Sequence, residues 1–122
     1  MGKAMGIGGI FLRSADPATL AAWYRDRLGI DADVAGGDRL WMTEAGPTVF
    51  AAFPAASDYW PANRPWMINF RVTDLAGLIE SLRAADVEVR TDPGWDDPTF
   101  GRFARIHDPE GNPIELWEPP AD

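Results

Sequence analysis

The chain has no cysteine, a single histidine (His107) and a single lysine (Lys3) among its 122 residues. Without cysteine it can form no disulfide, thiolate metal site or cysteine nucleophile, and a reducing cytoplasm is the expected location. One histidine likewise excludes a metal site built from several imidazoles. Any functional site must therefore be built without thiolates or a histidine cluster.

Long apolar runs and an excess of positive charge are also missing. No apolar stretch approaches the roughly 20 residues of a membrane span, and the N-terminus lacks the apolar core of a signal peptide. The formal net charge is −8, which would repel a phosphate backbone. Neither a nucleic acid nor a membrane is therefore expected as a partner. The acidity serves either solubility or the attraction of a cationic ligand.

The composition, with 46% apolar and 25% charged residues, is typical of one globular domain, here residues 1–122. Within it, residues 10–25 align with residues 68–83 at an offset of 58. The identical pairs are Ile10/Ile68, Arg13/Arg71, Asp16/Asp74, Ala18/Ala76, Leu20/Leu78 and Arg25/Arg83. Two similar modules in so short a chain are expected to share one sheet or barrel, with the functional surface between them.

Each module is expected to begin with a strand and a helix and to continue with three short strands. Module one spans about 5–54, a proline-rich linker spans 55–65, and module two spans about 66–119. Asp16 and Asp74 are the expected N-caps of the two helices, and Gly29 ends the first. The expected strands lie at about 6–14, 31–35, 38–44 and 47–53 in module one, and at about 66–73, 86–91, 101–107 and 112–118 in module two.

The C-terminal segment GRFARIHDPEGNPIELWEP (101–119) consists of a strand, a tight turn and a partner strand. Asp108 and Pro109 start the turn, and Gly111 can take a positive φ. Together with the stretch AAWYRDRLGI after Asp16, this segment resembles the vicinal oxygen chelate superfamily of glyoxalases, bleomycin-resistance proteins and extradiol dioxygenases. The resemblance covers essentially the whole chain. It implies an α+β fold in which two tandem βαβββ modules form a cupped, partly closed mixed sheet with helices on the outer face. It also implies a homodimer that completes the pocket.

Enzymes of that superfamily commonly hold one divalent metal with histidine, glutamine or glutamate from four strands. Carried over one at a time, those positions are Gly9, Phe50, Met67 and Glu115 in this sequence. Only Glu115 offers an oxygen donor, and one carboxylate does not make a tight site. No metal or other cofactor is expected, although the sequence does not exclude a divalent metal.

Strand alternation sorts the expected sheet into two faces. One face is entirely apolar and should pack on the helices. The other mixes aromatic and polar side chains, as small-molecule cavities do. The predicted ligand pocket consists of Phe11, Arg13, Trp41, Phe50, Met67, Asn69, Arg71, Phe103, Arg105 and Trp117.

Glu115 is the leading candidate for a catalytic or binding group. Among the aromatic side chains of that face it would be desolvated, and could act as a general base or as the anion for a cationic ligand. Alternatively, it forms a structural ion pair with Arg105 or Arg71. The repeat-related Arg13 and Arg71 either clamp a carboxylate bidentately or bond neighbouring loops at the strand ends.

His107 precedes the tight turn, where a residue at the solvent edge is expected rather than a proton-transfer group. The chain also has six tryptophans, a high number for its length. They either offer stacking surfaces to a planar or cationic ligand or pack in the core and a dimer interface. The tryptophans with these two alternatives are Trp41, Trp60, Trp66, Trp95 and Trp117.

These features favour a metal-free binding protein of the glyoxalase/bleomycin-resistance type, which sequesters an aromatic or cationic compound in a pocket between the modules. The alternative is a lyase, isomerase or dioxygenase of the same superfamily that acts on a small oxygenated metabolite. It would use Glu115 as base or as sole remaining metal ligand. A third interpretation is an accessory module that serves only dimerisation or a protein partner. The sequence leans away from an enzyme but leaves the question open.

Overall fold

Both helices begin at an aspartate, as the repeat predicts. Helix α1 spans Pro17–Leu28, and the Asp16 side chain accepts a hydrogen bond from the backbone N–H of Thr19 at 3.2 Å. Helix α2 spans Leu75–Ala84, and Asp74 accepts one from Gly77 at 3.2 Å. A side-chain oxygen that satisfies one of the free N–H groups of the first turn stabilises the helix start. The helical part of the repeat is therefore confirmed.

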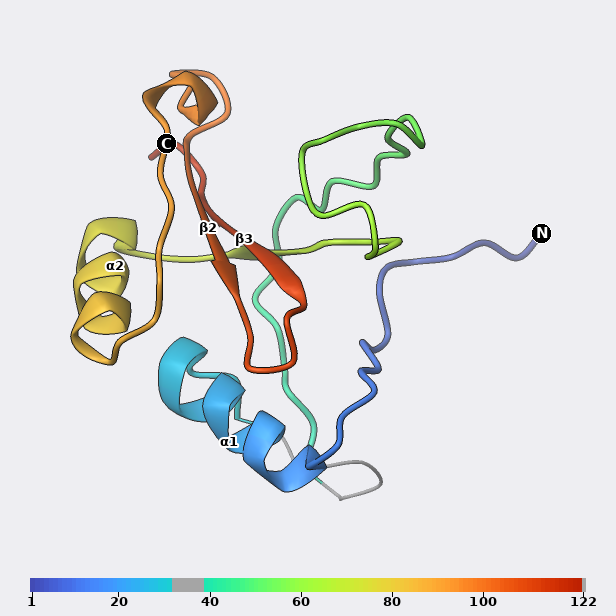
Figure 1. The fold of residues 1–122 in the computed structure, drawn as a ribbon. Coiled ribbons are helices and arrows are strands. Elements are labelled where there is room, and N and C mark those ends of the chain that lie inside the picture. The colour runs from blue at the N-terminus through green and yellow to red at the C-terminus, as the bar shows by residue number, and fades with distance from the viewer. Residues whose placement is uncertain (32–38, 122) are drawn as a thin grey trace. The chain divides into compact units, whose positions relative to one another are not determined.

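The computed structural model describes residues 1–31 and 39–121, and the chain falls into two units, Met1–Ala55 and Ala56–Asp122. The first unit holds α1, which buries Leu20 and Tyr24. The second holds α2 and the strands (Figure 1). Neither α1 nor α2, the α-helices of the described residues, is long and apolar enough to cross a membrane.

The strands of the second unit are β1 (Ile68–Arg71), β2 (Arg102–His107) and β3 (Pro113–Glu118). They form an open mixed sheet in the order β1-β3-β2, so β3 is the central strand. It runs parallel to β1 and antiparallel to β2. The strands predicted at 66–73, 101–107 and 112–118 are thus confirmed, and the chain has an α+β fold. The tandem βαβββ arrangement and the single-domain organisation stay predictions.

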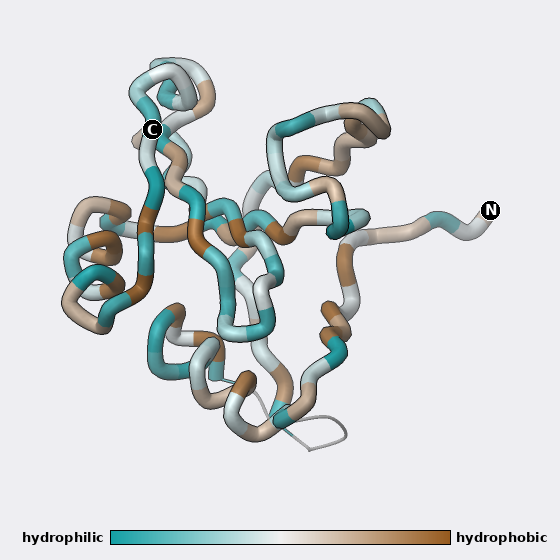
Figure 2. Tube along the Cα trace, in the orientation of Figure 1, coloured by the Kyte–Doolittle hydropathy of each residue, from teal (hydrophilic) through white to brown (hydrophobic). Residues whose placement is uncertain are grey.

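The core of the second unit lies on the apolar side of this sheet, where α2 contacts β3. Figure 2 shows apolar and polar positions interleaved along α2 and the strands. The buried side chains come from both layers: Leu75, Ile79 and Leu82 of α2, and Ala104, Ile106, Ile114 and Leu116 of the strands. The four strand residues lie on the apolar face that alternation predicts for β2 and β3.

The tight turn between β2 and β3 is built around the Asp108 carboxylate, which is buried. It accepts hydrogen bonds from the backbone N–H groups of Glu110 at 2.8 Å and Asn112 at 3.0 Å, and from the Asn112 side chain at 2.7 Å. Gly111 has a φ of 81°, as predicted. The two strands thus form a hairpin, and the Asp108 side chain stabilises its turn alongside the backbone hydrogen bonds between Asp108 and Asn112 and between Gly111 and Asp108.

The strands predicted at 6–14, 38–44 and 47–53 do not form in the described residues. An extended segment becomes a strand only when its N–H and C=O groups join a ladder with a neighbouring strand, and the described residues of these segments join no such ladder. Their apolar side chains are correspondingly exposed, Phe11 at 92% and Phe50 at 96%. The strand predicted at 31–35 lies, after Asp31, outside the described residues.

The strand predicted at 86–91 is reduced to one bridge, in which Arg90 and Arg105 exchange two backbone hydrogen bonds of 2.9 and 2.8 Å. Pairing does not continue towards Pro93, where the chain enters a different conformation. The Asp92 side chain also accepts from Gly94 at 2.8 Å and turns the chain into a short 3-10 helix, Pro93–Trp95.

Candidate functional site

Three polar side chains form a row across the face of the sheet opposite α2. In the strand register Glu115 of β3 lies beside Asn69 of β1 on one side and beside Arg105 of β2 on the other. Because residues paired across neighbouring strands share a face, the side chains of Asn69, Glu115 and Arg105 point the same way. We refer to these three residues as the polar row.

Glu115 is 9% exposed, and both of its carboxylate oxygens accept hydrogen bonds. The hydroxyl of Tyr59 donates to Oε2, and the side-chain amide of Asn69 donates to Oε1 at 2.7 Å. Within the described residues Glu115 forms no ion pair with Arg105. Neutral donors, rather than a cation, therefore hold this buried carboxylate.

Arg105 is 4% exposed and is held by aromatic rings and one hydrogen bond. Its Cζ atom lies 4.8 Å from the ring centre of Tyr59 and 5.7 Å from that of Trp95. Its Nη1 donates to the backbone carbonyl of Tyr59 at 2.8 Å. Stacked cations gain electrostatic stabilisation from the ring faces. Tyr59 thus bridges the polar row, since its hydroxyl binds Glu115 and its carbonyl binds Arg105.

Residues 56–65, which we call the covering segment, form hydrogen bonds to the hairpin of β2 and β3 at two places. At the first, Tyr59 binds Glu115 and Arg105 of the polar row. At the second, Arg64 donates to the carbonyl of Glu110 at 2.7 Å, in the turn between β2 and β3. The indole N–H of Trp60 donates to the carbonyl of Arg64 at 2.9 Å. The predicted linker therefore contributes side chains to this face of the second unit.

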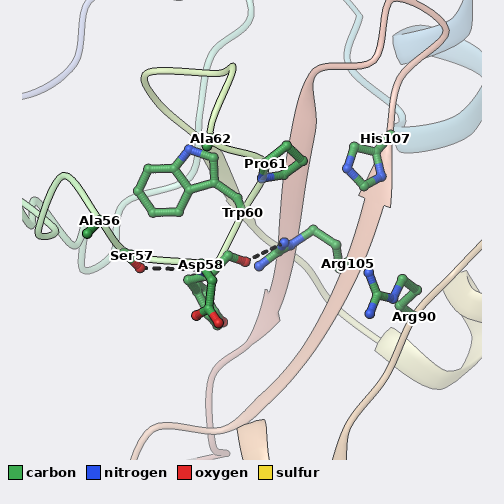
Figure 3. A pocket seen from close by; sticks show the side chains of 10 residues that line it. Ala56, Ser57, Asp58, Trp60, Pro61, Ala62, Arg90, Arg105 and His107 are labelled. Atoms are coloured by element: carbon green, nitrogen blue, oxygen red, sulfur yellow. Dashed lines mark hydrogen bonds between the residues drawn. The ribbon is translucent and has the colours of Figure 1, made fainter.

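A cavity of about 430 Å³ lies beside the polar row. Residues 56–62 form one wall, and Arg90, Arg105 and His107 form the other (Figure 3). The Trp60 indole and Pro61 give the first wall flat apolar surfaces, while the second is cationic. An aromatic surface facing a few polar groups is typical of a small-molecule site.

His107 is half-buried and lines this cavity, whereas the sequence predicts a solvent-edge position. Burial, and then the charge of Arg105, lower its pKa below the ordinary value. Near neutral pH its imidazole is therefore uncharged, because both effects disfavour the protonated form. The permanent cations of the cavity are Arg90 and Arg105, and the carboxylate among its lining residues is that of the exposed Asp58.

The other predicted pocket residues of the second unit lie on the same sheet face or next to it. Phe103 and Trp117 are paired in the register and stack with ring centres 6.2 Å apart and planes at 3°. Trp117 is buried and donates to the carbonyl of Phe100 at 2.6 Å. Arg71 is the register partner of Trp117, and Met67 is half-buried just before β1. These four residues do not line the cavity.

The remaining predicted pocket residues belong to the first unit. They are Phe11, Arg13, Trp41 and Phe50, all exposed in the structure. Their convergence with the residues of β1, β2 and β3 stays a prediction.

The residues at the superfamily's metal positions do not fit a metal ion. Gly9 and Phe50 bring no donor atom, Met67 brings a thioether, and both oxygens of Glu115 already accept protein hydrogen bonds. Among the described residues no three histidine, aspartate or glutamate side chains gather in a metal-binding arrangement. A hard or borderline divalent ion needs several such donors.

The sequence analysis missed the role of Tyr59 and the hydrogen bonds that hold the covering segment at two places. Tyr59 is separated from Glu115 by 56 positions and lies in an irregular segment, so no periodicity connects the two. One signal was available. A buried carboxylate needs donors, and a proline-rich segment that carries a tyrosine can supply one.

Tyr59 is expected to keep its phenolic proton until unusually high pH. Burial, and then the hydrogen bond and charge of Glu115, raise the pKa of Tyr59 from its ordinary 10.0 to about 12. Since the folded-state pKa is the higher one, the stability that Tyr59 contributes is full below pH 10 and is lost as the pH rises towards 12. The pKa of Tyr59 can be measured by following tyrosinate absorbance at 295 nm in a Tyr24→Phe variant, in which Tyr59 is the one remaining tyrosine.

The control for this titration is the same experiment with Glu115→Gln added. Removal of the carboxylate charge should bring the Tyr59 pKa down, although burial continues to raise it. Ionisation of Tyr59 at its ordinary value while the protein stays folded would contradict the geometry described above.

Residues 6–116 match the profile of the glyoxalase/bleomycin resistance protein/dioxygenase superfamily. Among solved structures, the chain is similar to TnmS3, an antibiotic-binding protein from Streptomyces sp. CB03234, with 22% identity and a TM-score of 0.53. The alignment covers 95% of this chain and 99% of that one. No curated protein matches the sequence. The structural likeness concerns the fold, whereas the family match spans nearly all of the sequence. The chain therefore belongs to the glyoxalase/bleomycin resistance protein/dioxygenase superfamily, as its motifs predict.

Proposed function

We propose that the protein binds a small aromatic compound in the cavity of its second unit and that it does so without a metal. The cavity wall carries the proposal. Trp60 and Pro61 offer flat apolar surface on one side, and Arg105 offers hydrogen-bond donors on the other. Aromatic faces supply contact area at low entropic cost, and a few placed polar groups orient the ligand.

The comparisons support a small-molecule-binding role but do not identify the ligand. The superfamily includes bleomycin-resistance proteins by name, and TnmS3, of the same fold, is described as binding an antibiotic. The sequence predicts an aromatic or a cationic ligand, and the aromatic one agrees with the cavity wall. The predicted location of the pocket between the modules stays a prediction.

The enzymatic alternative is a lyase, isomerase or dioxygenase with Glu115 as base or as sole remaining metal ligand. In that role the carboxylate would have to receive a proton or a metal ion. Both of its oxygens are engaged by Tyr59 and Asn69, so one of these bonds would have to break first. A binding protein needs no such step, and we therefore favour binding.

A homodimer and a cytoplasmic location also belong to the proposal. The homodimer rests on the superfamily resemblance, and the location rests on the lack of cysteine. Sedimentation of the protein at micromolar concentration tests the first: a monomer would contradict it.

The proposed function predicts saturable binding of planar compounds. In a panel of one- and two-ring aromatics that are acidic, neutral or basic, some members should change the tryptophan fluorescence and release or absorb heat in calorimetry. The fluorescence change should be lost in Trp60→Phe, because this indole lines the cavity. It should persist in Trp23→Phe, where the indole lies on α1.

Two results would contradict the proposal. If no member of the panel binds, the cavity is not a site for aromatic compounds. If binding changes the fluorescence of Trp60→Phe as much as that of the unaltered protein, the compounds bind elsewhere.

A further inference from the structure

The guanidinium group of Arg105 is buried but only partly satisfied. Nη1 donates to the carbonyl of Tyr59, whereas Nε and Nη2 have no hydrogen-bond partner among the described residues. A buried donor without an acceptor destabilises the folded state, so most such groups in proteins are paired. Two of them on one side chain mark a place where the described residues supply no acceptor.

The two unpartnered nitrogens are neighbours on the same edge of the group. In a planar guanidinium the N–H of Nε and one N–H of Nη2 point in parallel, and their separation matches that of two oxygens on one atom. A carboxylate fits this edge with two charge-assisted hydrogen bonds. The acceptor that completes Arg105 is therefore an oxyanion with two oxygens, rather than a single carbonyl.

The nearest carboxylate of the protein does not fill this position. Glu115 is the register partner of Arg105, but its oxygens are turned to Tyr59 and Asn69. Asp58 is the acidic residue of the cavity lining, and it too leaves Nε and Nη2 unpartnered. The edge is therefore without an acceptor, and because both nitrogens are buried, a ligand that binds them must first displace a neighbouring side chain.

The charges around the edge point to the same class of ligand. Arg90 lines the cavity beside Arg105, and the lowered pKa of His107 leaves its imidazole neutral. Two arginines and the exposed Asp58 line the cavity, and Glu115, the register partner of Arg105, is a further carboxylate next to the edge. The oxygens of Glu115 are turned to Tyr59 and Asn69, so the arginines supply the charged donors among the lining residues.

We propose that the ligand is an aromatic carboxylic acid whose carboxylate binds Nε and Nη2 of Arg105 while its ring lies against the wall of the covering segment. This inference rests on the proposed function and specifies its ligand class. A cavity of about 430 Å³ holds an acid of one or two rings. The proposed ligand is thus an anion, whereas the net charge of −8 favours a cation.

The test compares three probes of nearly equal shape by calorimetry: 2-naphthoate, 2-naphthamide and 2-naphthylmethylamine. The acid should bind about tenfold to a hundredfold more tightly than the amide, because the amide offers one acceptor and no charge. The amine should bind more weakly still. The ¹H–¹⁵N resonance of Arg105 Nε should shift on addition of naphthoate and stay in place with the amine.

Arg105→Lys is the decisive variant, because it keeps the positive charge and removes the paired donors. It should bind naphthoate about tenfold more weakly and lose the preference over naphthamide. Arg105→Met removes the charge as well, and Arg105→Lys serves alone if the methionine variant does not fold. Arg102→Lys is the matched control, since Arg102 lies on the same strand with its side chain 54% exposed, and it should bind as the unaltered protein does.

The outcomes separate the ligand class from the proposed function. If the three probes bind equally well, or if Arg105→Lys binds naphthoate unchanged, the ligand class is wrong while small-molecule binding stands. If none of the probes binds, both the ligand class and the proposed function are wrong.

Discussion

A Gly101→Ala variant is expected to lose about 3–5 kcal/mol of unfolding free energy, a large effect for the addition of one methyl group. Gly101 has a φ of 115°, which side chains rarely tolerate, and a Cβ atom there would overlap the carbonyl oxygen of Glu118. The backbone has little freedom to move away. Gly101 and Asp97 exchange two hydrogen bonds of 2.7 and 2.9 Å, and β2 begins at the next residue.

The variant Gly29→Ala is the control that shows how much a positive φ costs without a steric overlap. Gly29 has a φ of 73°, but a Cβ atom there meets nothing within 4 Å. Its replacement should therefore lower the unfolding free energy by only about 1–2 kcal/mol, the strain of the left-handed conformation. Urea unfolding followed by tryptophan fluorescence and circular dichroism compares the two. Equal losses would show that the contact with Glu118 relaxes freely.

Glu115→Ala is expected to lower the unfolding free energy by about 3–5 kcal/mol, as removal of one member of a buried charged cluster commonly does. The substitution leaves the Tyr59 hydroxyl and the Asn69 amide without their acceptor. It also removes the negative charge that neighbours the buried Arg105. Urea unfolding measures the loss, and Glu80→Ala on the exposed surface of α2 should stay within about 0.5 kcal/mol of the unaltered protein.

A double-mutant cycle with Tyr59→Phe isolates the bond that joins the covering segment to β3. Because the acceptor is charged, a coupling of about 1.5–3 kcal/mol is expected. Additive losses would mean that the Tyr59–Glu115 bond contributes nothing to stability, and that residues 56–65 are held by Arg64 and packing alone.

The elements that could be predicted are those whose sequence carries a helix cap or an alternating strand pattern. An aspartate before a periodic apolar stretch located both helices, and alternation assigned the inward and outward residues of β1, β2 and β3. The strands expected in the first module share the same apolar pattern and do not form within residues 1–31 and 39–55. A pattern states which side chains would share a face, but a strand also requires a neighbour with free N–H and C=O groups.

The predictable part of the site is the polar row. Asn69, Arg105 and Glu115 fall on one face by alternation alone, and the structure places them side by side. Tyr59 comes from an irregular segment and Trp95 from the short 3-10 helix, and the position of both over the sheet is set by tertiary contacts rather than by any repeat. The charge of the cavity was not predictable either, because a net charge of −8 averages over the chain and says nothing about which residues surround a given pocket.

The connections between the strands also suggest an order of assembly for the second unit. β2 and β3 are joined by a short turn, whereas β1 must find β3 across 46 positions. Closing the longer loop costs more chain entropy, so we expect the hairpin to form early and β1 to add to it afterwards. The covering segment depends on both, because Tyr59 binds a β3 residue and Arg64 binds the hairpin turn. We therefore expect the cavity to form only at the end of folding, because its two walls come from the covering segment and the hairpin.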